Sequence, residues 1–129
     1  MKEPAAEWFR KAENDVGTAR REAAVTEGAN WDAVCFHVQQ AIEKCLKGFL
    51  QHFEMEFPRT HDLNVLLNLI AQKIPEFDVL TTDFEFISAF AVEFRYPGED
   101  ALQEDAENAL QILEKALSVF RAKLAEIRK

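Results

Sequence analysis

Residues 31–53 read WDAVCFHVQQAIEKCLKGFLQHF and carry the most regular hydrophobic pattern in the chain. Apolar residues recur there in alternating steps of four and three, at Trp31, Cys35, Val38, Ile42, Cys45 and Phe49. This is the spacing of one face of an α-helix. Asn30, directly before the segment, is a residue type that caps helix N-termini. The segment therefore predicts a long helix with one inward face.

Four further segments have apolar residues at helical spacing and are separated by proline or glycine, namely 4–26, 61–73, 82–94 and 100–129. Thr60 is expected to cap the second of them, and Thr82 with Glu85 reads as a capping box. The segment 82–94 is expected to bury Phe84, Ile87, Phe90, Ala91 and Phe94, and the segment 100–129 to turn Leu102 inward. No segment has the alternation of a strand. We predict one all-α domain over residues 1–129, an antiparallel up-down four-helix-type bundle with an additional short helix.

The charge of the chain is unevenly distributed. It has 15 basic and 23 acidic residues and a net charge of −8. Residues 54–107 hold thirteen acids and only three bases, Arg59, Lys73 and Arg95, so the net charge of this segment is −10. The remaining residues have a net charge of +2. An acidic molecule repels nucleic acid and anionic lipid unless a local basic patch exists. We expect no DNA or membrane binding, and a cytoplasmic protein, since no apolar run is long enough for a membrane span or signal peptide.

The two cysteines, Cys35 and Cys45, fall in one predicted helix, ten residues apart. At 1.5 Å per residue they lie roughly 15 Å apart along the axis, too far for a disulfide. No cysteine or histidine spacing typical of zinc sites is present. We expect two buried thiols, no metal and no cofactor.

Phe36 does not fit the inward face of the 31–53 helix. At 100° per residue it lies beside Glu43 and Lys47, away from the core. An exposed phenylalanine indicates a surface that something else covers. A homodimer or higher homo-oligomer, or a heteromeric partner, is one explanation, and a short helix of the same chain is the other.

Three strings occur in this order: FHVQQAIEKCLKGFL at 36–50, RTHDL at 59–63 and FRYP at 94–97. Together they resemble the HEPN domain, an all-helical family found in higher eukaryotes and prokaryotes. The resemblance extends from AEWFRKAENDVGTAR at 6–20 to the last helix. It implies a helical bundle that usually dimerises, with a cleft for a nucleotide or RNA at the subunit interface.

The resemblance also implies partners and an activity. Many HEPN proteins are metal-independent ribonucleases or toxins, and many are encoded beside a small nucleotidyltransferase that acts as the antitoxin. In the nuclease branch an arginine is followed a few residues later by a histidine. Arg95 matches the arginine, but Asp100 stands near the place of the histidine. Histidine suits proton transfer at neutral pH, whereas an ionised aspartate repels phosphate, so a ribonuclease of the usual kind is not expected.

The candidate ligand-binding residues are Gln40, Lys44, Lys47, His61, Asp62, Arg95 and Tyr96. Lys44 and Lys47 belong to a polar stripe that is either a solvated face or an anion-binding patch. Arg95 is either an ion-pair partner of the neighbouring acids or a phosphate anchor, and Tyr96 either ends a helix or stacks on a base. His61 is a candidate base or ligand contact, and Asp62 favours a helix start.

Other polar residues are assigned structural positions. His37 and His52 are expected in solvent, and Gln39 in a hydrogen bond between helices. The acidic cluster 99–107 suits a helix N-terminus, a basic partner or a weakly held magnesium ion.

Three functions follow from these residues. The first is a HEPN-family nucleotide- or RNA-binding accessory module that acts with a small nucleotidyltransferase, as in a toxin-antitoxin pair. The second is a metal-independent RNA endonuclease toxin that uses Arg95 and His61. The third is a non-catalytic protein-interaction module that docks a basic partner on its acidic surface.

Overall fold

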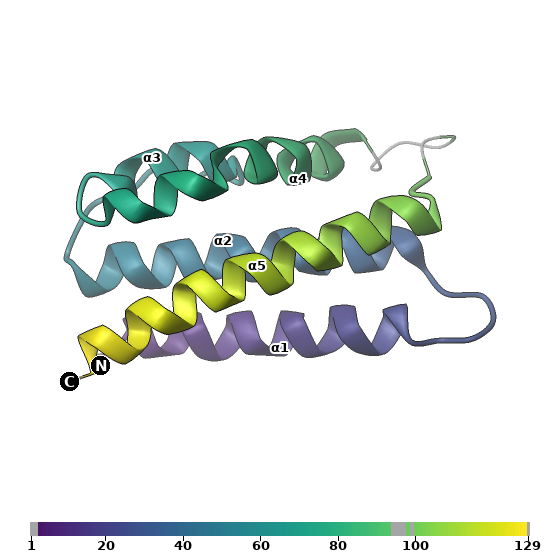
Figure 1. Ribbon diagram of the computed structural model, residues 1–129, viewed down its shortest axis with the longest axis horizontal. Helices are drawn as coiled ribbons and strands as arrows, with labels where there is room; N and C mark the ends of the chain where they lie inside the picture. The colour runs from purple at the N-terminus through teal and green to yellow at the C-terminus, as the bar shows by residue number, and fades with distance from the viewer. Residues whose placement is uncertain (1–2, 94–97, 99, 129) are drawn as a thin grey trace.

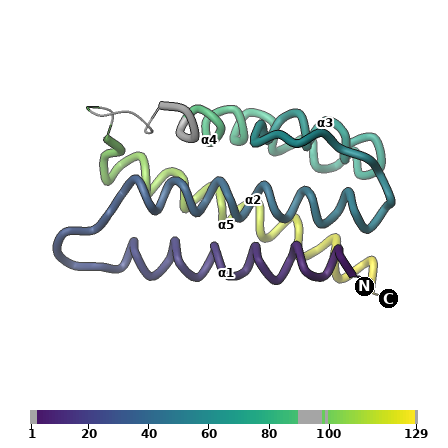
Figure 2. Tube along the Cα trace, turned by 180° about the vertical axis from the view of Figure 1, so that it is seen from behind, coloured from purple at the N-terminus to yellow at the C-terminus, as the bar shows by residue number. Residues whose placement is uncertain are grey.

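A computed structural model describes residues 3–93, 98 and 100–128. This part of the chain forms five α-helices and no strand: α1 (Ala5–Ala23), α2 (Trp31–His52), α3 (Leu63–Ala71), α4 (Thr81–Glu93) and α5 (Gln103–Ile127), with a 3-10 helix, η1 (Pro75–Leu80), before α4. The long helices α1, α2, α4 and α5 alternate in direction, and short α3 lies beside α4 (Figure 1, Figure 2). The predicted all-α four-helix-type bundle with an additional short helix is confirmed.

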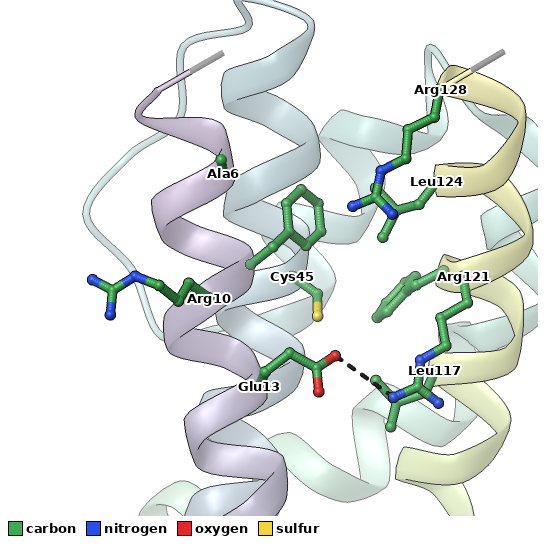
Figure 3. A pocket seen from close by; sticks show the side chains of 10 residues that line it. Ala6, Arg10, Glu13, Cys45, Leu117, Arg121, Leu124 and Arg128 are labelled. Atoms are coloured by element: carbon green, nitrogen blue, oxygen red, sulfur yellow. Dashed lines mark ion pairs between the residues drawn. The ribbon is translucent and has the colours of Figure 1, made fainter. Parts of the chain in front are cut away.

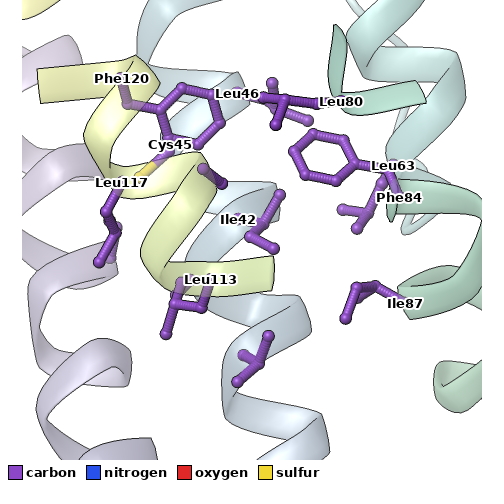
Figure 4. Packing of buried hydrophobic residues seen from close by; sticks show 14 of the residues in the cluster. Ile42, Cys45, Leu46, Leu63, Leu80, Phe84, Ile87, Leu113, Leu117 and Phe120 are labelled. Atoms are coloured by element: carbon purple, nitrogen blue, oxygen red, sulfur yellow. The ribbon is translucent and has the colours of Figure 1, made fainter. Parts of the chain in front are cut away.

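The central helix of the bundle is α2, which contacts all four other α-helices. Five residues of its predicted inward stripe are buried, namely Cys35, Val38, Ile42, Cys45 and Phe49. They pack with side chains from α3, η1, α4 and α5 in one hydrophobic cluster (Figure 4). The regular spacing of the 31–53 segment therefore does specify the core.

Close packing of α1 on α2 depends on Gly48. A Cβ atom at this position would lie 2.7 Å from Cε2 of Phe9, inside the contact distance of real side chains. Val34 and Ala41, at the same seven-residue spacing, are fully buried. The small residues of α2 thus allow α1 to lie along its whole length, as their spacing predicts.

One side of α2 is buried where the sequence pattern predicts exposure. Glu43 and Lys47 are only 3% and 9% exposed, although they share a face with Phe36. The segment 57–61 lies against this side of α2: the His61 ring contacts Glu43, and Lys47 borders a cavity together with residues of this segment and Trp8 of α1. Phe36 lies beyond the covered part and is 50% exposed. Its predicted exposure is confirmed, and the short helices described here do not cover it.

The start of α3 differs from the prediction. Asp62, not Thr60, is the N-cap residue, and its Oδ1 accepts hydrogen bonds from the backbone N–H groups of Asn64 and Val65. The Thr60 hydroxyl instead accepts from Asp62 N at 3.0 Å. His61 and Asp62 therefore precede the helix, and α3 begins at Leu63.

Two other helix starts also differ. α4 begins at Thr81, directly after η1, so Thr82 lies inside the helix and is not its cap. α5 begins at Gln103, where the Asp105 side chain accepts from Leu102 N at 2.8 Å. Leu102 is consequently 65% exposed and not part of the core. The side chains of Phe90, Ala91 and Phe94, whose burial is also predicted, are outside the part that the structure describes, whereas Phe84 and Ile87 are buried as predicted.

The acidic residues at the start of α5 are accounted for in part by the helix itself. Asp105 forms the capping interaction, and Glu104 and Glu107 are exposed. Among the described residues, no three His, Cys, Asp or Glu side chains converge as a metal site requires. No described helix has both the length and the apolar character that a membrane span needs.

Both cysteines are buried and unbonded, as predicted. Burial raises the pKa of each thiol to about 12, because a thiolate is poorly solvated in the protein interior. The thiols are therefore protonated at neutral pH and behave as small apolar side chains.

Candidate functional site

A buried carboxylate organises the polar side of α2. Glu43 Oε2 accepts a hydrogen bond from Lys47 Nζ at 2.9 Å, and Oε1 lies 2.8 Å from His61 Nδ1. Gln39 Nε2 adds a longer bond to Oε1, at 3.3 Å. Each oxygen of the carboxylate is thus satisfied, which is the condition for burying a charge at tolerable cost.

His61 is held in place by hydrogen bonds to its backbone carbonyl and to its ring. Gln39 Nε2 donates to the His61 carbonyl at 2.9 Å, and the cap at Asp62 holds the next residue. With Nδ1 directed at Glu43, the Nε2 edge is left for solvent or a ligand, and the side chain is 65% exposed. A carboxylate at Nδ1 fixes the tautomer and orientation of an imidazole, as in many acid–base and metal sites.

A cavity of about 420 Å³ lies next to this pair. Its lining consists of Trp8, Lys47, Phe57, Arg59, Thr60 and His61. Lys47 Nζ lies 5.5 Å from the centre of the Trp8 ring, so its charge is held between that ring and Glu43. Two aromatic rings, two cations and one imidazole therefore surround one space.

Arg59 is the cation of this cavity that has no bonded partner among the residues that the structure describes. It is exposed and forms no ion pair within residues 3–93, 98 and 100–128. Its guanidinium presents five N–H donors in a planar fork that suits phosphate or carboxylate. Lys47, by contrast, already has a carboxylate partner.

A second buried carboxylate, that of Asp15, lies between α1 and α2 and has two partners. Asp15 is 8% exposed, and its two oxygens lie 2.8 Å from His37 Nδ1 and 2.6 Å from Lys44 Nζ. The prediction that His37 is simply solvated is wrong, because α1 places Asp15 against it. Lys44 therefore faces α1 and does not line the cavity. Gln40 donates to Gln39 at 2.9 Å and supports the neighbouring network.

A comparison with protein-family models places the chain. The model of the HEPN domain matches residues 5–123. The chain belongs to the HEPN domain family. The crystal structure of an archaeal HEPN homologue has the same fold, with a TM-score of 0.72 and 23% identity over 95% of this chain and 98% of that chain. At that identity the likeness concerns the fold alone. Comparison with curated proteins gives no match.

The candidate residues of this HEPN chain separate into four groups. Lys47 and His61 lie together at the cavity, joined through Glu43. Asp62 is a helix cap, as its structural interpretation suggests. Gln40 and Lys44 lie away from the cavity lining. Arg95 and Tyr96 are outside the described residues.

Several lining residues were not among those candidates. Arg59 and Thr60 stand in the RTHDL string, and Arg59 is one of three bases in the acidic part of the chain. The reasoning that singles out Arg95 there applies equally to Arg59. Trp8 lies at helical spacing from the buried Ala5 and Ala12 of α1, but it is only half-buried and borders the cavity. Nothing in the local pattern distinguishes Phe57.

Proposed function

We propose that this HEPN chain is a nucleotide- or RNA-binding accessory module and that the cavity at Trp8, Lys47, Arg59 and His61 is its ligand site. The observation that carries the proposal is the combination of an arginine that no described residue pairs with, an oriented histidine and two aromatic rings around a cavity of about 420 Å³. Pockets of this size accommodate small ligands. Aromatic rings stack on bases and arginine binds phosphate.

The residues divide the binding in the following way. Arg59 contacts a phosphate, His61 donates or accepts at Nε2, and Trp8 or Phe57 stacks on the base. Lys47 contributes positive potential without being free, because Glu43 holds it. Arg95 and Tyr96 of the FRYP string are proposed as a further phosphate contact and stacking ring.

Arg59→Ala is expected to weaken nucleotide or RNA binding tenfold or more, because a charge-assisted hydrogen bond contributes about 1.5–3 kcal/mol. The measurement is isothermal titration with ATP, GTP and short single-stranded RNA. Arg21→Ala is the matched control, since Arg21 is exposed on α1 and does not line the cavity. Equal affinity of the two variants, or no binding by the wild type, refutes the proposal.

The proposal includes a homodimer and a nucleotidyltransferase partner, as the family resemblance implies. Phe36 is the feature that favours a covered surface: it is 50% exposed and packs edge-on against His37 at 5.2 Å between ring centres. Light scattering of the wild type and of Phe36→Ser distinguishes a dimer through this surface from a monomer. Co-purification with the co-encoded protein tests the partner.

A second candidate function, metal-independent RNA cleavage, is favoured by the contact between His61 and Glu43. A histidine oriented by a buried carboxylate is suited to general acid–base catalysis. If the chain is such a nuclease, we expect metal-free preparations to cleave bulk RNA and His61→Ala to lower the cleavage rate about 10²–10⁴-fold. His52→Ala, which alters an imidazole outside the cavity lining, serves as the control. A wild type that does not cleave RNA excludes the nuclease and leaves the binding proposal standing.

A further inference from the structure

A second cavity opens between α1 and α5, over α2, and shares no lining residue with the Trp8 cavity (Figure 3). Its volume is about 480 Å³. The apolar part of the lining consists of Ala6, Phe9, Cys45, Leu117, Phe120 and Leu124, of which Cys45, Leu117 and Phe120 are buried. The apolar side chains that are only partly buried, and so can contact a ligand in the groove, are those of Ala6, Phe9 and Leu124.

Two arginines of α5 reach into the space between the helices (Figure 3). Arg121 pairs with Glu13 at 3.6 Å, which is too long for a hydrogen bond. Arg128 forms no ion pair with any described residue. Both guanidinium groups therefore have donors available beside an apolar surface.

Arg10, at the rim, is different. Its guanidinium is bound to Glu7 on the same helix and points away from the groove (Figure 3). The hydrogen bond from Arg10 lowers the pKa of the Glu7 carboxyl. The groove thus has two available cations on one wall and a neutralised one on the other.

We propose that the α1–α5 groove is a second ligand site and that it binds a medium-chain alkyl carboxylate. The chain lies on Ala6, Phe9 and Leu124, and the carboxylate lies between Arg121 and Arg128. Arginine binds carboxylate through two parallel N–H···O bonds, and an apolar wall beside the pair strengthens them. This charge complementarity distinguishes the groove from a simple packing defect.

The volume of the groove favours a small amphiphile over a helix of a partner protein. A helix about 10 Å across occupies roughly 400 Å³ per turn, and helix-in-groove recognition uses anchors over two turns or more. The cavity holds about one turn. At about 30 Å³ per heavy atom, a value taken from liquid water, it accommodates roughly 16 heavy atoms. Decanoate, with ten carbons and two oxygens, fits within this limit.

The test is titration of the isotope-labelled protein with decanoate, below its micelle-forming concentration, followed by amide chemical shifts. We expect saturable shifts at residues of the groove, and a dissociation constant roughly tenfold higher for Arg121→Gln and for Arg128→Gln. Arg10→Gln, the matched control, should bind as the wild type does. Decanol, which lacks the charge, and propionate, which lacks the chain, should each bind at least tenfold more weakly.

A further variant separates ligand binding from a change in folding. Glu13→Gln removes the carboxylate that competes for Arg121, so decanoate binding should become several-fold tighter. The proposal is overturned if decanol binds as well as decanoate, if the Arg121 and Arg128 variants retain wild-type affinity, or if Glu13→Gln weakens binding. Absence of saturable shifts in the wild type overturns it as well.

Discussion

Replacing Glu43 with alanine is expected to lower the free energy of unfolding by about 3–5 kcal/mol. Glu43 is 3% exposed and accepts from Lys47, which is itself buried, so the substitution leaves a buried ammonium without a countercharge. His61 and Gln39 lose their acceptor at the same time. Denaturation in urea, followed by circular dichroism, measures the change.

The matched control is Glu114→Ala. Glu114 binds Arg20 with good geometry, but both side chains are about half exposed, so solvent screens the pair and the loss should be within about 1 kcal/mol. A double variant, Glu43→Ala with Lys47→Met, removes both buried charges and should recover much of the stability lost by Glu43→Ala. A loss below about 1 kcal/mol for Glu43→Ala, or no recovery in the double variant, contradicts this account.

The core was predictable because its signal is local. Cys35, Ile42 and Phe49 repeat at the spacing of a helix face, and this face stays inward whatever the neighbouring helices are. The same reasoning fails for Glu43, since periodicity assigns one inward face and α2 has two. The segment 57–61 that buries Glu43 is joined to α2 through contacts that no spacing within α2 encodes.

The prediction of where α3 begins failed for a different reason. THD at 60–62 offers two capping residue types within three positions, and either Thr60 or Asp62 can accept from backbone N–H groups. The structure uses both, with Thr60 bonded to Asp62 N and Asp62 capping α3. Sequence alone does not rank two such caps.

The cavity was only partly predictable. Lys47 and His61 were candidates because their residue types carry charge and proton chemistry, but Trp8, Phe57 and Arg59 come from three separate positions in the chain. These residues are brought together only because the segment 57–61 packs against α2. Ligand sites of this kind are assembled by long-range packing. The RTHDL string therefore indicated one segment of the site but not the residues from elsewhere in the chain that line the cavity with it.

Phe120→Ala is expected to lower the free energy of unfolding by about 3–5 kcal/mol, comparable with the loss at Glu43 but through packing. Phe120 is 1% exposed, and its ring lies 5.6 Å from Phe49, 5.3 Å from Phe77 and 6.5 Å from Phe84, centre to centre. It therefore joins α5 to α2, η1 and α4 (Figure 4). Urea denaturation measures the loss, and Val79→Ala, at a side chain 61% exposed, should stay within about 0.5 kcal/mol of the wild type.

The origin of the loss is tested by a double-mutant cycle. If the aromatic cluster acts as a unit, Phe49→Ala combined with Phe120→Ala should cost less than the sum of the single substitutions by about 0.5–3 kcal/mol, because each single change already removes the shared contact. Additivity within about 0.3 kcal/mol would show that the two rings contribute independently. Phe120 would then attach α5 through its contacts with Phe77 and Phe84 and not through Phe49.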